Sequence, residues 1–177
     1  MEKGSIEEFM IQNGESDDSM LHSKLFDINM RLFNNNKRYQ HLVLEIIGYM
    51  EEVAEKEFSD YTPAKGISGA NVGVPFNIIG VKNKKNKWDF FINPKCIKRS
   101  SIKKVVKSNC GSLRLKESIK VERHKWVKLR YYNLEGEEKT KCFDNSYGYT
   151  VQHEVNHNNG ILIIDEERAL TGATSGS

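Results

Sequence analysis

Apolar residues recur at helical spacing in the segment 38–58, which carries the clearest periodic pattern of the chain. Glutamates fill many of the intervening positions, so that one face is apolar and the other charged. Spacings of three and four residues are typical of an amphipathic helix that packs on a core. We therefore predict a helix over 38–58, with a core-facing stripe made of Tyr39, Leu42, Val43, Ile46, Ile47, Met50, Val53 and Ala54.

Shorter segments that resemble half-buried strands follow this helix, because apolar and polar residues alternate along several of them. Loop-forming stretches at 82–87 and 133–136 would join them as hairpins, and Asn93-Pro94 predicts a further turn. A helix, then hairpins, then a second helix favour an α+β fold with antiparallel sheets. The predicted strands are 78–81, 88–92, 97–106, 119–121, 126–132 and 139–143.

Length and composition restrict the class of protein. The chain has 177 residues, a net charge of +3 and 38% hydrophobic residues, so we predict one domain over 1–177 with poorly ordered ends at 1–18 and 168–177. No apolar run approaches the ~20 residues of a membrane span, and the first residues lack a secretory pattern. Three cysteines without framework spacing argue against a disulfide scaffold and for a reducing cytoplasm.

A metal-binding pattern, His153-Glu154-Val155-Asn156-His157, lies near the end of the chain. On a helix both imidazoles would share one face, with about 5–6 Å between Cβ atoms, so that they reach one ion. Glu154 points elsewhere and is available to act on a water molecule at that ion. Residues 144–146 offer N-cap oxygens, Gly160 would end the helix, and 161–164 has strand-like composition. The alternative is a surface helix that contains two histidines by chance.

A catalytic ion needs a third protein ligand beside the two imidazoles. Cys110 stands out, because it lies among small residues where the backbone can approach an ion. Cys142 falls in the middle of a predicted strand and fits a core position, and Cys96 follows the predicted turn. A thiolate suits ferrous iron, zinc, nickel or cobalt, so ligand type leaves the metal open. The other candidates are His22, His41, His124 and the acidic residues.

Three segments resemble the motifs of the peptide deformylases, bacterial and organellar enzymes that remove the N-formyl group from nascent polypeptides. The stretch 66–75, Gly-Ile-Ser-Gly-Ala-Asn-Val-Gly-Val-Pro, is similar to the family's Gly-Leu-Ala-Ala-Pro-Gln-Val-Gly-Val-Pro. Ser-Asn-Cys-Gly-Ser at 108–112 is similar to Glu-Gly-Cys-Leu-Ser, and Gln-His-Glu-Val-Asn-His at 152–157 to Gln-His-Glu-x-Asp-His. The resemblance runs from about 38 to 165, in the family's order and spacing, and implies the deformylase fold.

The resemblance implies a metal centre built by the second and third motifs. Cys110, His153 and His157 would bind one divalent ion, which would be ferrous iron in the cell, with zinc, nickel or cobalt as alternatives. Water at the ion would attack the formyl carbon after giving a proton to Glu154, which would then protonate the leaving amine. The ligands and this carboxylate are all present in the chain.

The resemblance also implies where the substrate binds. The side-chain amide of Asn71 and the backbone N–H of Gly111 would hold the oxyanion. Gly111 stands where the family has leucine, which loosens a segment that should be rigid. The implied substrate-binding residues are Gly66, Ile67, Ser68, Gly69 and Ser112.

Three further departures from the family pattern fall on supporting positions. Asn71 is one methylene shorter than glutamine, and the loss of one oxyanion donor typically costs ~3 kcal/mol of transition-state stabilisation. Ser108 replaces a glutamate whose usual partner is an arginine matching Arg123, so that Glu122 or another acid would have to substitute. Asn156 replaces an aspartate, and changes of this kind often cost ~10–100-fold in metal affinity or activity. The implied structural supports are Arg123, Gln152 and Asn156.

We expect a divergent working deformylase that acts on N-formyl peptides or nascent chains. An amidase with a different N-acyl substrate and a non-catalytic peptide-binding relative are the alternatives, and a zinc endopeptidase is the weakest choice. The lysine-rich loop 82–87 fits a solvated loop, with a weak ribosome contact as the functional alternative. We expect a cytoplasmic monomer with neither DNA nor a membrane as a partner.

Overall fold

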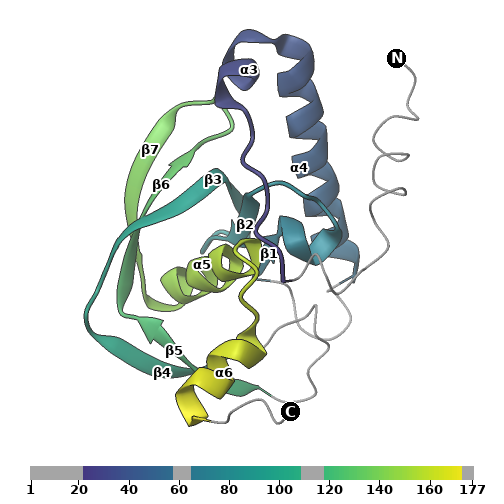
Figure 1. The fold of residues 1–177 in the computed structure, drawn as a ribbon. Coiled ribbons are helices and arrows are strands. Elements are labelled where there is room, and N and C mark those ends of the chain that lie inside the picture. The colour runs from purple at the N-terminus through teal and green to yellow at the C-terminus, as the bar shows by residue number, and fades with distance from the viewer. Residues whose placement is uncertain (1–21, 58–64, 109–117, 173–177) are drawn as a thin grey trace.

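The computed structural model describes residues 22–57, 65–108 and 118–172. Its longest helix is α4 (Lys37–Glu57), which follows the short helix α3 (Met30–Asn35) (Figure 1). The helix predicted over 38–58 is thereby confirmed as far as its described residues extend. Most of the predicted stripe is buried, whereas Leu42 lies at its exposed margin. The buried members of the stripe are Val43, Ile46, Ile47, Met50 and Ala54.

A five-stranded antiparallel sheet forms the centre of the described structure, with the strand order β1-β2-β3-β6-β7. Two of its ladders are the hairpins expected from the loops 82–87 and 133–136. An α+β fold with antiparallel sheets is therefore confirmed. The strands are β1 (Gly66–Ser68), β2 (Ile78–Lys82), β3 (Trp88–Arg99), β6 (Trp126–Tyr132) and β7 (Glu138–Asp144).

The turn predicted at Asn93-Pro94 is wrong, because β3 continues through both residues. The register with β6 shifts between Ile92 and Lys95, so the proline lies in a β-bulge, where its missing N–H breaks no ladder. Asn93 has a positive φ of 51° and exchanges two 2.8 Å hydrogen bonds with the backbone of Ile28. A tertiary contact thus holds this bend inside the strand. The strand predicted over 97–106 is two strands in the structure. Its first residues, as far as Arg99, belong to β3, and those from Lys103 belong to the next strand.

A second, two-stranded sheet pairs β4 (Lys103–Ser108) with β5 (Ile119–His124). Helix α6 (Ile163–Thr171) packs on this hairpin, where Ile163 contacts Val121 in a small apolar cluster. The strand expected at 161–164 is therefore wrong, since Ile163 and Ile164 begin a helix. Helix α6 includes residues 168–171 of the end expected to be poorly ordered, and both 1–18 and 173–177 lie outside the described residues.

Helix α5 (Asn145–Asn158) carries the His-Glu pattern and lies against the inner face of the sheet (Figure 1). Val151 and Val155 join Ile79, Phe91 and Leu129 in the apolar cluster between helix and sheet. Asp144 is the N-cap residue, but its side chain makes no capping hydrogen bond. The helix ends before Gly160, as expected, with a φ of 74° at that glycine. Packing on the sheet therefore decides where this helix lies.

Candidate metal and hydrolase site

His153 and His157 lie on the same face of α5, as their spacing predicts. Their Nε2 atoms are 3.0 Å apart and their rings meet edge to face at 88°. Both side chains are buried, with exposed fractions of 9% and 1%. Burial lowers the pKa of His153 well below its usual value and that of His157 to about 4, and nearby Arg123 adds to both shifts. Both rings are therefore neutral at pH 7, which is the state that binds metal ions.

The contact between Arg123 and His153 favours one tautomer of the His153 ring. Arg123 Nη2 lies 3.4 Å from His153 Nδ1, and a guanidinium group can only donate. In this contact Nδ1 accepts, and the His153 proton on Nε2 faces His157 Nε2. For His153 Nε2 to bind an ion as a neutral imidazole, this proton would have to move to Nδ1, which would then no longer accept from Arg123.

Glu154 is buried beside the histidine pair, and burial raises its pKa to about 8, against the opposing effect of Arg123. Its Oε2 atom has no hydrogen-bond partner among the residues that the structure describes. Its Oε1 atom lies over Gly66 of β1, where an added Cβ would come within 2.5 Å of it. A carboxyl group with a pKa near neutrality can both accept and donate a proton at pH 7.

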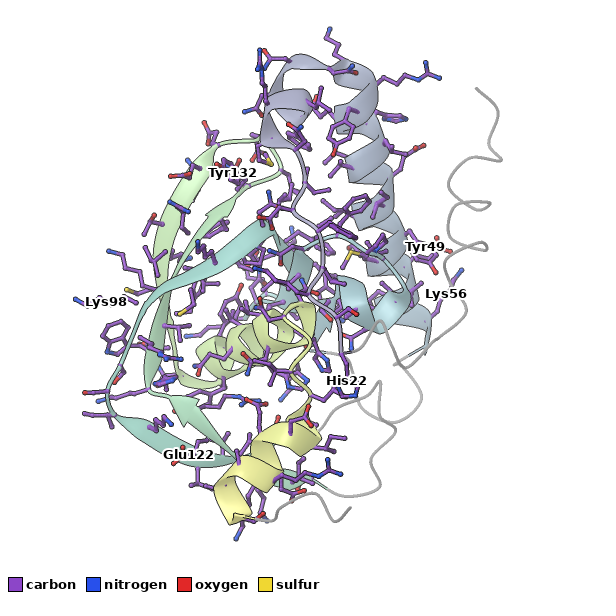
Figure 2. The ribbon with its side chains drawn as sticks, in the orientation of Figure 1. His22, Tyr49, Lys56, Lys98, Glu122 and Tyr132 are labelled. Atoms are coloured by element: carbon purple, nitrogen blue, oxygen red, sulfur yellow. The ribbon has the colours of Figure 1, made fainter. Side chains whose placement is uncertain are left out.

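Glu166 of α6 is the carboxylate that Arg123 contacts. Arg123 Nη1 lies 2.5 Å from Glu166 Oε1, and Asn156 Nδ2 donates to the same oxygen at 2.7 Å. Glu122, the acid considered from the sequence, instead pairs with Lys103 at 2.9 Å and lies on the exposed side of the β4–β5 hairpin (Figure 2). The partner of Arg123 therefore comes from the helix that follows α5.

Gln152 links α5 to the end of β5 through hydrogen bonds. Its Nε2 donates to the carbonyl oxygen of His124 and its Oε1 accepts from the His124 N–H, both at 2.9 Å. Nε2 also contacts the Gly148 carbonyl oxygen at 3.2 Å. Because the Gln152 side chain makes two hydrogen bonds with the backbone of His124, it fixes the position of α5 relative to β5. Gln152 lies one residue before His153.

Asn71 lies on the 3-10 helix η1 (Gly69–Val72), next to β1. Its Oδ1 accepts from the Ser68 N–H at 2.9 Å and from Ser68 Oγ at 2.6 Å. With the carboxamide oxygen held in this way, the donor end of the group is Nδ2, the end that an oxyanion requires. The shorter side chain is thus rigidly oriented by its own loop.

The predicted substrate-binding residues differ in which groups, side chain or backbone, they can present to a substrate. Gly66 lies directly beside Glu154, whereas the Ile67 side chain is buried in the apolar core with Ile46 and Ile78. Ser68 and Gly69 are also buried, so these residues can meet a substrate mainly through their backbone. Cys110, Gly111 and Ser112 lie outside the described residues.

The other candidate ligands from the sequence lie apart from the histidine pair. Cys96 and Cys142 are both exposed. The core position expected for Cys142 is therefore wrong: it lies opposite Lys128 on the sheet, one residue before the buried Phe143. His124 Nδ1 contacts the carbonyl oxygen of Ser100 at 2.7 Å, His41 pairs with Glu45 on α4, and His22 is exposed. Within 22–57, 65–108 and 118–172, no three His, Cys, Asp or Glu side chains converge as metal ligands.

Two polar residues at the site, the partly buried Glu166 and the buried Asn158, were not singled out from the sequence. Glu166 contacts the supports Arg123 and Asn156. Asn158 Nδ2 donates to the Ile78 carbonyl oxygen at 3.0 Å and ties the end of α5 to β2. The requirement of a buried arginine for an acid is the one signal that pointed towards Glu166, and it does not specify which acid.

The chain is similar to a known protein family, to individual members of that family and to solved structures. The family model described as polypeptide deformylase matches residues 14–171. A peptide deformylase from Rhodopseudomonas palustris strain TIE-1 is 28% identical over 139 residues, which cover 74% of this chain and 79% of that protein. The crystal structure of peptide deformylase from Plasmodium falciparum aligns with a TM-score of 0.69 at 25% identity, covering 85% of this chain and 81% of that one. The Met-Ala-Ser-bound class I type b peptide deformylase from Acinetobacter baumannii aligns with a TM-score of 0.64 at 26% identity, covering 84% and 92%.

Proposed function

The chain belongs to the polypeptide deformylase family, and on this premise we propose that it is a metal-dependent hydrolase that removes the N-formyl group from the N-terminal methionine of nascent peptides. The observation that carries this proposal is the pair of buried, neutral imidazoles whose Nε2 atoms converge to 3.0 Å beside Glu154. Such a pair has the donor atoms of a transition-metal site.

His153 and His157 would hold the ion, with Cys110, outside the described residues, as the third ligand. Glu154 Oε2, which is buried without a hydrogen-bond partner among the described residues, and the facing ring nitrogens fit a group that brings positive charge to this position. When bound, the ion supplies Lewis acidity to water and to the formyl oxygen. The set of two imidazoles and one thiolate suits ferrous iron, with zinc, nickel and cobalt as alternatives.

Glu154 would move the proton in this reaction. Its carboxylate takes a proton from the attacking water molecule and returns it to the amine nitrogen as the C–N bond breaks, which releases formate and the free N-terminus. Burial favours this role, because it raises the pKa of the carboxyl from its usual value and so helps Glu154 to hold the proton between the two steps. Gly66 leaves space for the carboxylate next to β1.

Asn71 and β1 would bind the substrate. The Asn71 amide, oriented by Ser68, would donate to the oxyanion together with the N–H of Gly111. Among the described strands β1 pairs with β2 alone, so its other side fits the backbone of an extended peptide. Ile67, Ser68 and Gly69 would then contact the substrate through backbone groups.

We place this activity in the cytoplasm, where nascent chains are made, and we propose a monomer with no more than a weak ribosome contact. None of the described helices is both long and apolar enough to cross a membrane.

The test is formate release from N-formyl-Met-Ala-Ser by protein that is purified without air and loaded with ferrous iron. We chose this peptide because the tripeptide Met-Ala-Ser is bound in the Acinetobacter baumannii structure. Glu154→Gln preserves the shape of the side chain and should lower kcat at least ~100-fold, because it removes the proton acceptor.

N-acetyl-Met-Ala-Ser separates the alternatives. Acetate release without formate release would favour an amidase with a changed acyl group. Binding of Met-Ala-Ser by protein that releases neither acid would favour a non-catalytic peptide-binding relative. Either result would reject the proposed deformylase activity.

A further inference from the structure

We infer that Glu166 is a positioning residue of the metal site, which acts on the His153–His157 pair through Arg123 and Asn156. This inference rests on the proposed metal site and names a component of it from α6, outside the three motifs. The evidence is one carboxylate oxygen, Glu166 Oε1, that receives both the Arg123 guanidinium and the Asn156 amide.

Arg123 needs this carboxylate because of where it lies. Its side chain is 2% exposed and its Nη2 atom lies 3.4 Å from the ring of His153. An uncompensated cation at this position would repel a divalent ion on the other side of the same ring. Glu166 is 14% exposed, so water screens the pair little, and its negative charge offsets that of the guanidinium. We therefore expect Glu166 to raise the affinity of the site for a metal ion.

Asn156 gives Glu166 a second, direct connection to α5. Asn156 lies between the two histidines in sequence, and its Nδ2 donates to Glu166 Oε1 at 2.7 Å. An aspartate at 156 would place a second carboxylate against the first, whereas an amide complements it. This arrangement explains two departures from the family motifs together. Glu166 on α6 supplies the carboxylate that Ser108 lacks, and Asn156 supplies an amide that donates to it.

Helix α6 is built to hold Glu166 in place. Ile163 packs against Val121 on β5, the strand that carries Arg123, and Asp165 Oδ2 accepts from the Leu162 N–H at 3.0 Å. Glu166 lies in the first turn of the helix, where the helix dipole stabilises a negative charge. The carboxylate is therefore carried by an anchored helix end.

The experiment exchanges the carboxylate and the amide between the two contacting positions. The variants are Glu166→Gln, Asn156→Asp and the double variant, which restores one acid and one amide. The matched control is Glu167→Gln, the next residue on α6. The affinity for Co(II) is measured by competition with a chelator, the visible spectrum of the Co(II) protein reports ligand geometry, and urea unfolding of the metal-free protein reports stability.

We expect Glu166→Gln to weaken Co(II) binding ~10–100-fold and to change the Co(II) spectrum. The double variant should recover affinity to within about threefold of the unmodified protein, and Glu167→Gln should not change it. If Glu166→Gln does not fold, recovery of a folded, Co(II)-binding protein by the double variant supports the inference.

The inference is overturned if Glu166→Gln lowers stability alone, with the affinity and spectrum of the folded protein unchanged. It is also overturned if the double variant binds Co(II) no better than Glu166→Gln. Failure of the unmodified protein to release formate would reject the proposed activity, while the Co(II) comparison would still decide the role of Glu166.

Discussion

Gly66 and Glu154 lie so close together that a Cβ at residue 66 would stand 2.5 Å from Glu154 Oε1 and 2.9 Å from its Cγ. Gly66 belongs to the edge strand β1 and Glu154 to the inner face of α5. The glycine therefore does more than permit a turn, because its missing side chain is the space that the carboxylate occupies.

Gly66→Ala should push the Glu154 carboxylate away from its position. A displacement of about 1 Å at a catalytic group can cost ~100-fold in rate, so we expect kcat/KM for formate release to fall by about this factor. The measurement is formate release by the ferrous protein at several substrate concentrations.

Gly48→Ala is the matched control for this change. Gly48 lies in the middle of α4, and apart from the helix's own backbone no atom of the described residues lies within 4 Å of an added Cβ. The substitution should leave kcat/KM unchanged and raise the free energy of unfolding by up to ~1 kcal/mol, because alanine favours the helix. Equal activity of Gly66→Ala and the unmodified protein would contradict the close packing of Gly66 and Glu154.

Gln152→Ala should destabilise the protein, because both His124 backbone groups lose their partner. Buried unsatisfied groups cost ~1–3 kcal/mol, which urea unfolding can resolve. Gln40→Ala on α4 is the control and should change the free energy of unfolding by less than ~0.5 kcal/mol. A similar small effect for both substitutions would show that the Gln152 bonds contribute little.

Stability should fall as the pH rises above about 10, in part because of Tyr147. Burial, and then the hydrogen bond to Asp89 Oδ2 at 2.8 Å, raise the pKa of Tyr147 above its usual value of 10.0. Above that pH the unfolded tyrosine loses its proton while the folded one keeps it, so the unfolded state binds fewer protons and stability decreases with pH.

Tyr147→Phe removes this titration, so its stability should fall less steeply between pH 10 and 12. Urea unfolding of both proteins over this range is the measurement. Tyr131, whose pKa is also raised, keeps its share of the slope in both proteins. Identical slopes would rule out a protected Tyr147 phenol.

Removal of the metal ion should abolish formate release without unfolding the chain, because the apolar clusters on both sides of the sheet do not depend on the site. Adding an ion back at ~100 times its Kd should restore activity and raise the free energy of unfolding by ~2.7 kcal/mol. Activity that persists in protein shown by elemental analysis to be free of metal would contradict a metal-dependent mechanism.

Local patterns in the sequence were enough to predict several parts of the structure. The period of the 38–58 segment predicts α4, because a buried stripe requires that spacing on any helix. The four-residue interval between His153 and His157 places both rings on one face of α5 for the same geometric reason. The family motifs predict one particular fold, which the amino-acid composition alone does not predict.

Tertiary packing decided the features that local patterns misjudged. Asn93-Pro94 reads as a turn, yet contacts with Ile28 hold it as a bulge within β3. The run Ile161–Ile164 has strand composition, but contact with Val121 favours a helix whose apolar side chains face β5. Short apolar segments adopt the structure that buries them, which depends on residues distant in sequence.

The acid that completes the support of the site also depends on the tertiary structure. A buried arginine requires a carboxylate, but charge complementarity alone does not distinguish Glu122, its neighbour in sequence, from Glu166, which lies 43 residues away. Strand geometry directs Glu122 outward to Lys103, and the packing of α6 brings Glu166 inward. Residue type determines that a partner is needed, whereas only the fold determines which residue reaches it.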